Sequence, residues 1–158
     1  MNKNVIISVK GNQYYSTTED SIELVTEGKY YKKGNNYFVT YKETEITGME
    51  GTTTTLKIGD GKVTLMRFGE NNSQLVFEEG EKHLCYYETP HGSFTVGVFS
   101  NQVNINVNDT GGELQVDYLL EIDQMRAGKN DFYIQIREAQ ITDDKSSGNS
   151  KKPNYPIN

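Results

Sequence analysis

The segment Thr52–Phe68 constrains the fold more than any other, because it specifies both a turn and the pairing of two strands. Asp60 and Gly61 form the residue pair most typical of a two-residue β-hairpin turn, in which both residues take positive φ. Such a turn places Leu56 opposite Leu65, and the side chains on their face are more apolar than those on the other face. We therefore expect this face to point into a core.

The rest of the chain repeats this pattern of short strands separated by turn residues. Gly34 and Asn35 offer a second two-residue turn, which places Gly28 opposite Tyr41 and leaves room for a ring or a bend in the sheet. Residues 11–20 are polar and typical of a turn. Beside the hairpin, strands are expected at residues 4–10, 21–33, 36–45, 73–78, 82–89, 93–100, 102–107, 113–123 and 131–138.

The number and spacing of these strands predict a closed sheet. No amphipathic helix interrupts them, and a meander of this length would expose two long edges if it stayed open. We expect an all-β fold, a single antiparallel β-barrel of about 8–10 strands with mostly meander topology. The barrel domain is predicted over residues 1–140. Residues 141–158 are polar and lack a pattern, so we expect a disordered C-terminal tail.

Alternation also predicts which side chains point inward in the later strands. The inward residues are expected to be Leu84, Tyr86 and Glu88 in the first of them, Phe94, Val96 and Val98 in the next, Leu114, Val116, Tyr118, Leu120 and Ile122 in residues 113–123, and Phe132, Ile134 and Ile136 in the last. These faces and the hairpin face would together form the barrel core.

The charge of the chain narrows the choice of partner. The formal net charge is −6, which argues against nucleic acid or an anionic membrane as the main partner. Residues 29–33 (KYYKK) interleave cations with aromatics as single-strand binders do, but Tyr30 is expected to point inward, and a solvated strand end explains the pattern better.

Few features of the sequence indicate where in the cell the protein is located. Cys85 is the single cysteine, so an intramolecular disulfide is excluded and a cytoplasmic location is expected. The apolar residues 5–7 are too few for a signal peptide, and no apolar run reaches the length of a membrane span.

Three runs of the chain resemble a known family of proteins. They are residues 41–78, which include the string ITGMEGTTTTLKI, residues 83–98 (HLCYYETPHGSFTVGV) and residues 111–122 (GGELQVDYLLEI). The resemblance is to the YwiB-like family of small, uncharacterised bacterial proteins, and it spans residues 3–138. It implies a calycin-like, that is lipocalin-like, β-barrel without an established activity. Lipocalins carry a Gly-x-Trp motif, and because this chain has no tryptophan their signature does not carry over.

Two opposite charges are expected on an otherwise apolar inward face. Glu43 continues the face of Tyr41, and Arg67 continues the face of Leu65, toward the same end of the barrel. A buried carboxylate and a buried guanidinium are expected to pair. The pair could anchor the polar end of a ligand in a cavity with Tyr41, Tyr86 and Tyr118 as aromatic walls. The bland interpretation, which the pattern favours, is a structural ion pair near the barrel rim.

Other reactive side chains give weaker patterns. His83, Cys85 and His91 could suggest a metal site or a nucleophile with a base, but no further ligand, oxyanion hole or orienting carboxylate accompanies them. We interpret Cys85 as a partly buried thiol on an outward face. The carboxylate pairs Glu43/Glu45 and Glu78/Glu79 could suggest a glycosidase, although such pairs arise readily among 22 acidic residues. We assign no catalytic residue, metal or cofactor.

The sequence therefore predicts a small cytoplasmic β-barrel that is not an enzyme and binds a small apolar or lipid-like ligand in its interior. A protein-interaction or structural barrel with a filled core is the alternative, and no protein partner is identified. A void of several hundred Å³ would favour ligand binding.

Overall fold

The structure, a computed structural model, describes residues 2–14, 19–70, 72–89, 91–122 and 125–139. The predicted tail, residues 141–158, lies outside the described residues. None of the described residues form a helix that could span a membrane.

The described residues form one closed antiparallel barrel, in which each strand pairs with its neighbours in the chain and the first strand pairs with the last. The strands are β1 (Asn2–Tyr14), β2 (Glu19–Lys33), β3 (Asn36–Lys42), β4 (Thr52–Gly59), β5 (Lys62–Gly69), β6 (Asn72–Glu78), β7 (Lys82–Thr89), β8 (Gly92–Asn108), β9 (Gly111–Ile122) and β10 (Met125–Glu138). The predicted all-β meander barrel is confirmed. Closure leaves no long unpaired edge.

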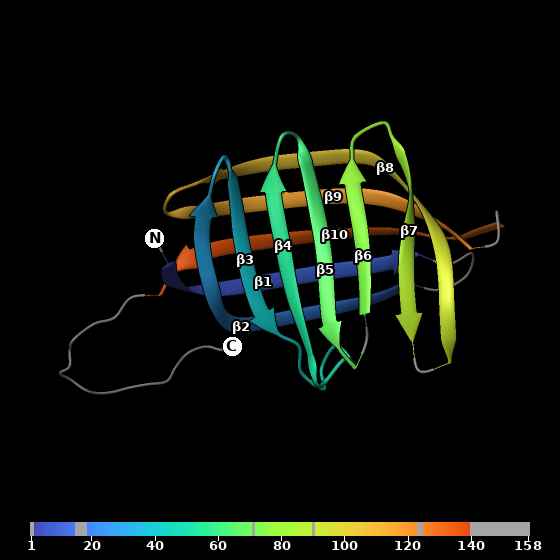
Figure 1. The fold of residues 1–158 in the computed structure, drawn as a ribbon, viewed down its shortest axis with the longest axis horizontal. Coiled ribbons are helices and arrows are strands. Elements are labelled where there is room, and N and C mark those ends of the chain that lie inside the picture. Colours follow the sequence, from blue (N-terminus) through green and yellow to red (C-terminus); the bar gives the residue numbers. More distant parts are fainter. Residues whose placement is uncertain (1, 15–18, 71, 90, 123–124, 140–158) are drawn as a thin grey trace.

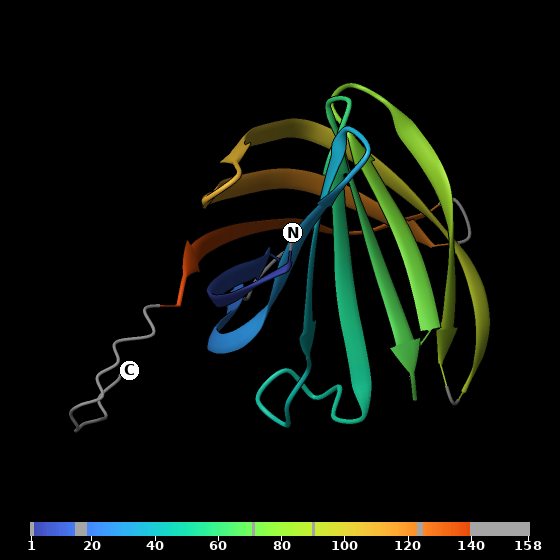
Figure 2. The ribbon, with the colours of Figure 1, turned by 60° about the vertical axis from the view of Figure 1, so that its left-hand side comes forward.

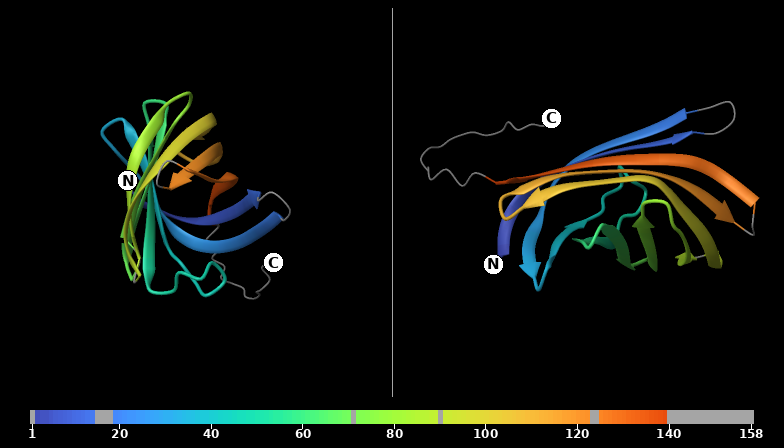
Figure 3. Two further views of the ribbon diagram at one scale, coloured as in Figure 1. Left: turned by 90° about the vertical axis from the view of Figure 1, so that its right-hand side faces the viewer. Right: turned by 90° about the horizontal axis from the view of Figure 1, so that it is seen from above.

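The barrel is flattened into two layers whose strands cross. Figure 1 shows β3 to β7 upright on the near side, with β9, β10 and β1 running crosswise behind them. The long strands β2 and β8 bend from one layer into the other, which joins the layers at two corners (Figure 2, Figure 3). Orthogonal packing of this kind places the inward side chains of both layers in one shared interior.

The predicted hairpin register is confirmed. Asp60 and Gly61 have φ of 54° and 72°, as a primed turn requires, and Leu56 pairs with Leu65. Both leucines are buried in the core, which confirms that their face points inward. Local turn chemistry therefore sets the register of the near layer.

Gly28 lies at the corner where β2 begins to pair with β3. It pairs with Tyr41, as predicted. A Cβ at this position would approach the side chain of Ile7 and the carbonyl oxygen of Thr40 to 2.4 Å each. Only glycine therefore allows β1, β2 and β3 to approach this closely at the bend.

The strands β1, β2 and β10 are longer than predicted. Residues 11–14 and 19–20, expected in a turn, belong to β1 and β2, and β10 begins at Met125. The two expected strands at residues 93–100 and 102–107 are one strand, β8, with a register shift between Ser100 and Gln102. Pairing with long neighbours extends these strands through polar residues, because the ladder bonds do not depend on side-chain polarity.

The prediction for β7 is wrong by one residue. Leu84 and Tyr86 are 76% and 51% exposed, whereas Cys85 is only 5% exposed and belongs to the core. The inward face of β7 is therefore that of Cys85 and Tyr87. A shift of one residue exchanges the two faces of a strand, and both faces of β7 carry hydrophobic residues, so the pattern alone was ambiguous.

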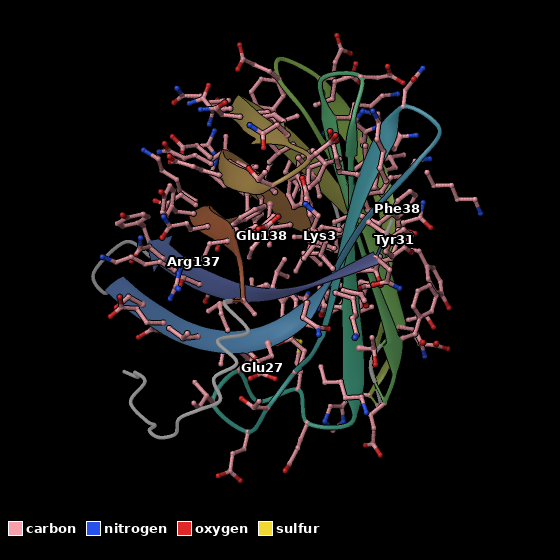
Figure 4. The ribbon with its side chains drawn as sticks, turned by 90° about the vertical axis from the view of Figure 1, so that its left-hand side faces the viewer. Lys3, Glu27, Tyr31, Phe38, Arg137 and Glu138 are labelled. Atoms are coloured by element: carbon pink, nitrogen blue, oxygen red, sulfur yellow. The ribbon has the colours of Figure 1, made fainter. Side chains whose placement is uncertain are left out.

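One end of the barrel is closed by its own side chains. Tyr30 is fully buried, as predicted, and its hydroxyl donates to the carbonyl oxygen of Asn108 at 2.8 Å. Lys3 forms a salt bridge with Glu138 at 2.6 Å, and the two lie side by side in Figure 4. These contacts link β2 with β8 and β1 with β10 at this end of the barrel. An opening to the interior is therefore expected at the opposite end.

Candidate ligand-binding cavity

A cavity of about 550 Å³ occupies the barrel interior away from the closed end. Thr47 and Met49, from the connection between β3 and β4, line it, as do residues at the ends of β1 and β9. Ile22, Phe94 and Ile122 also line the cavity and are each partly exposed to solvent. These exposed lining residues mark the mouth.

The deeper walls of the cavity are apolar. Leu24, Leu65, Leu75, Val96 and Ile134 are all buried and line it. Aromatic rings adjoin these walls: Tyr118 and Phe132 line the cavity and pack against the fully buried Phe77, with ring centroids 4.8 and 5.3 Å from that of Phe77. The cavity therefore offers an apolar surface that a hydrophobic ligand could cover.

One row of inward side chains differs from these walls because it is largely polar. Cross-strand pairing from β3 to β8 defines this polar row as Tyr41, Thr54, Arg67, Ser73, Tyr87 and Phe94. Consecutive members lie directly opposite one another on neighbouring strands, so their side chains are adjacent. The row brings hydroxyl groups and one guanidinium together, and two of its members, Thr54 and Arg67, lie next to the Glu43 carboxylate.

Glu43 is held by hydroxyl groups. Its backbone N–H donates to the carbonyl oxygen of Thr52 at 2.8 Å, which continues the ladder beyond the end of β3. Its side chain is 1% exposed and accepts hydrogen bonds from Thr47 Oγ1 at 2.9 Å and from Thr54 Oγ1. Burial, and then the charge of Glu43, raise the pKa of Tyr41. The hydroxyl groups of two threonines, which are uncharged donors, thus compensate the buried carboxylate for its lost hydration.

Arg67 faces Glu43 at a longer distance. Its Nε lies 3.9 Å from Glu43 Oε2, an ion-pair distance that is too long for a hydrogen bond. The side chain is 17% exposed and lines the cavity. Arg67 Nε is buried without a hydrogen-bond partner among the described residues, and so is Oγ of Ser73, its neighbour in the polar row. These two groups retain unused hydrogen-bonding capacity, and buried groups of this kind need an explanation.

Tyr118 connects the aromatic walls to this charge pair. Burial raises the pKa of Tyr118 to about 12, while the nearby Arg67 acts to lower it and Tyr87 and Asp131 act to raise it. The phenol is therefore neutral at physiological pH. Because Arg67 and Tyr87 both affect the pKa of Tyr118, the aromatic wall lies close to the polar row.

Four of the five residues predicted for a ligand site come together here. Tyr41, Glu43, Arg67 and Tyr118 all line the cavity, and the predicted pairing of Glu43 with Arg67 is confirmed. The fifth, Tyr86, lies on the outer surface, where its hydroxyl forms a hydrogen bond with Ser93 Oγ at 3.1 Å.

Tyr87 takes the place expected for Tyr86. A signal for it existed in the sequence. A two-residue connection between Thr89 and Gly92 pairs Tyr87 with Phe94, whose inward face was predicted, and the structure contains this pairing.

Cys85 and the histidines do not converge. The Cys85 thiol is buried, which corrects the expected outward face. It accepts a hydrogen bond from the N–H of Val76 at 3.4 Å, next to the short ladder between β6 and β7. Burial raises the pKa of this thiol, which opposes nucleophilic reactivity. His83 Nε2 lies 3.0 Å from Glu78 Oε1. The described part of the chain contains no group of three or more His, Cys, Asp and Glu side chains placed to hold a metal ion.

In each of the two carboxylate pairs, the two side chains have different surroundings. Glu43 is buried, whereas Glu45 is exposed to solvent. Glu78 contacts His83, whereas Glu79 Oε1 accepts a hydrogen bond from the N–H of Val103 at 3.0 Å. Neither pair therefore faces a common substrate position, as a pair of glycosidase carboxylates must.

Comparison with known proteins agrees with this architecture. Residues 7–134 match the family described as "Domain of unknown function (DUF1934)". The chain is 24% identical over 117 residues to the "Uncharacterized beta-barrel protein YwiB" of Bacillus subtilis (strain 168), a match that covers 74% of this chain and 77% of that protein.

A solved structure has the same fold. The crystal structure of the ywiB protein from Bacillus subtilis matches with a TM-score of 0.74 at 17% sequence identity, over 88% of this chain and 94% of that one. The family match, residues 7–134, includes residues of every barrel strand. The chain therefore belongs to the DUF1934 family, the family of uncharacterised YwiB-like β-barrel proteins.

Proposed function

We propose that this barrel binds a small, largely apolar ligand in its cavity and that Arg67 holds the polar end of that ligand. The observation that carries the proposal is a cavity of about 550 Å³ with apolar walls and one guanidinium whose Nε has no hydrogen-bond partner among the described residues. Small-molecule sites have volumes of this order and combine apolar walls with a few polar groups that orient the ligand.

The position of Arg67 supports this role. A guanidinium loses favourable hydration when it is buried, and its donors must be satisfied in another way. Glu43 lies too far from Nε for a hydrogen bond, and Glu43 itself is already held by Thr47 and Thr54. A ligand atom that accepts a hydrogen bond from Nε would complete the site.

A structural or protein-interaction barrel with a filled core remains the alternative function. The closed end favours it, since Tyr30, Phe77 and Ile58 are buried there. The other half of the interior favours ligand binding, because the cavity lies there. We also propose binding without catalysis, since the neutral Tyr118 and the hydrogen-bonded Glu43 suit recognition of a ligand more than proton transfer at neutral pH.

Native mass spectrometry of freshly purified protein tests the proposal. The expected result is an added mass on a fraction of the wild-type protein, and loss of this mass in Arg67→Met, which keeps most of the side-chain volume but removes the donors. Arg137→Met is the matched control, because Arg137 is exposed near the end of β10 and does not line the cavity.

A fluorescent reporter extends the test to ligands lost during purification. Nile red, an uncharged dye, should bind wild-type protein and Arg137→Met with similar affinity. Absence of both an added mass and dye binding in a folded protein would reject the ligand-binding function and favour the filled barrel. Equal ligand loss in both arginine variants would reject Arg67 as the anchor.

A further inference from the structure

We infer that the ligand presents an uncharged hydrogen-bond acceptor, such as a hydroxyl or carbonyl oxygen, to Arg67, and that the cavity discriminates against ionised head groups. This inference rests on the proposed function and specifies its ligand class. It follows from the balance of charge and of hydrogen-bonding capacity around the polar row.

The charge of Arg67 is already balanced. Glu43 and Arg67 lie 3.9 Å apart, so together they present no net charge to a ligand. An anionic head group would add a third charge to this pair and would have to lose its hydration without an unbalanced cation to compensate it. An uncharged acceptor loses far less hydration on burial.

The remaining charges near the cavity also disfavour an anion. Asp20 and Asp131 line the cavity in addition to Glu43, and Asp131 is near enough to Tyr118 to affect its ionisation. Arg67 is the only Lys or Arg among the described residues that line the cavity. These three carboxylates outnumber Arg67, so the potential in the cavity is negative and repels carboxylate and phosphate groups.

A cationic head group is disfavoured by the charge of Arg67. Glu43 is the buried carboxylate that a cation would seek, but Arg67 Nε already lies 3.9 Å from it and would repel a second cation at this position. Among the described residues, the buried polar groups near this pair that lack a hydrogen-bond partner are Arg67 Nε, a donor, and Ser73 Oγ, which can donate or accept.

A hydroxyl or carbonyl head group suits this capacity. Its oxygen can accept from Arg67 Nε, and its second lone pair can accept from Ser73 Oγ. The apolar part of the ligand then covers walls formed by residues such as Leu65 and Leu75, which precede and follow the polar row along β5 and β6. The cavity thereby selects an uncharged amphiphile.

Competition with Nile red tests the inference directly. The probes are dodecanol, dodecanoate and dodecyltrimethylammonium, which share one alkyl chain and differ in the charge of the head group. At neutral pH, the two ions are used below their micellar concentrations and dodecanol below its solubility limit. Wild-type protein should bind dodecanol at least about tenfold more tightly than either ion, since burial of an ionised head group beside an already balanced ion pair costs more than the free energy that corresponds to this factor.

A single substitution should change the preference. Glu43→Gln removes the balancing charge and leaves Arg67 as an uncompensated cation, so affinity for dodecanoate should rise at least about tenfold while affinity for dodecanol changes little. Glu45→Gln is the matched control, because Glu45 is an exposed carboxylate two residues away. It should leave the order of the three probes unchanged.

The outcomes separate this inference from the function on which it rests. Tighter binding of dodecanoate or dodecyltrimethylammonium to wild-type protein would overturn the inference and leave ligand binding intact. Failure of all three probes to displace bound Nile red would overturn the inference alone, whereas failure of Nile red and of every probe to bind would overturn the proposed function as well. If Glu43→Gln does not fold, the ranking with wild-type protein still decides.

Discussion

Substitutions of Glu43 and Arg67 should differ in their effects on stability, although the two residues form one ion pair. Glu43 has a side chain that is 1% exposed and accepts two side-chain hydrogen bonds from threonines. Arg67 is 17% exposed, and its Nε makes no hydrogen bond within the described part of the chain. We predict that Glu43→Gln lowers the free energy of unfolding by about 3 kcal/mol and that Arg67→Met lowers it by about 1 kcal/mol.

The difference follows from the geometry. At 3.9 Å the attraction between the two charges is about 4 kcal/mol for an effective dielectric constant of about 20, and desolvation of the two ions costs a similar amount. The pair itself therefore contributes little. Hydrogen bonds to a charged acceptor contribute about 1.5–3 kcal/mol each, and glutamine can replace only part of those to Thr47 and Thr54.

Urea denaturation of the wild-type protein, the two single variants and the double variant measures these values and their coupling. The slope with urea should be unchanged in all four proteins, which shows that the substitutions act on the native state. A loss in Arg67→Met that equals or exceeds the loss in Glu43→Gln would refute the reasoning, because it would mean that the salt bridge and not the hydroxyl groups holds the carboxylate.

Two further substitutions test the corner and the aromatic wall. Gly28→Ala should lower the free energy of unfolding by about 3 kcal/mol, because its Cβ would meet the carbonyl oxygen of Thr40; Gly11→Ala, whose Cβ would have no neighbour within 3.4 Å, should have little effect in the same urea titration. The raised pKa of Tyr118 makes a prediction for alkaline pH: the unfolded tyrosine ionises near pH 10.0 and the folded one near 12, so stability present below pH 10 should be lost progressively between these values. Thermal unfolding measured across this range should show a shallower decline in Tyr118→Phe, and an unchanged decline would contradict burial of the Tyr118 hydroxyl.

Much of the near layer could be predicted from local patterns. Asp60 and Gly61 specify a turn, the turn sets which residues of β4 and β5 face each other, and alternation then places Arg67 inward. The same reasoning from Gly34 and Asn35 correctly paired β2 with β3 and placed Glu43 near Arg67. Each step depends on residues close together in the chain, so sequence alone was sufficient.

The orientation of β7 could not be predicted from its pattern. Leu84 and Tyr86 make one face hydrophobic, and Cys85 and Tyr87 make the other face hydrophobic. Which face points inward depends on how β7 pairs with its two neighbours. Tyr87 lies opposite Phe94 of β8 and opposite Ser73 of β6. The error placed Tyr86 in the predicted site, although it lies on the outer surface, and concealed Tyr87.

The sequence by itself determined an all-β chain, its hairpins, most inward faces and the pairing of one buried carboxylate with one guanidinium. These features follow from turn residues and from a side-chain period of two, which act over a few residues. Only the tertiary structure decided that the interior is filled at the end of Tyr30 and open at the end of Phe94, since a void depends on how side chains from all strands meet. The arrangement of side chains from several strands also leaves Arg67 Nε without a hydrogen-bond partner among the described residues, and no pattern within one strand records such a distance.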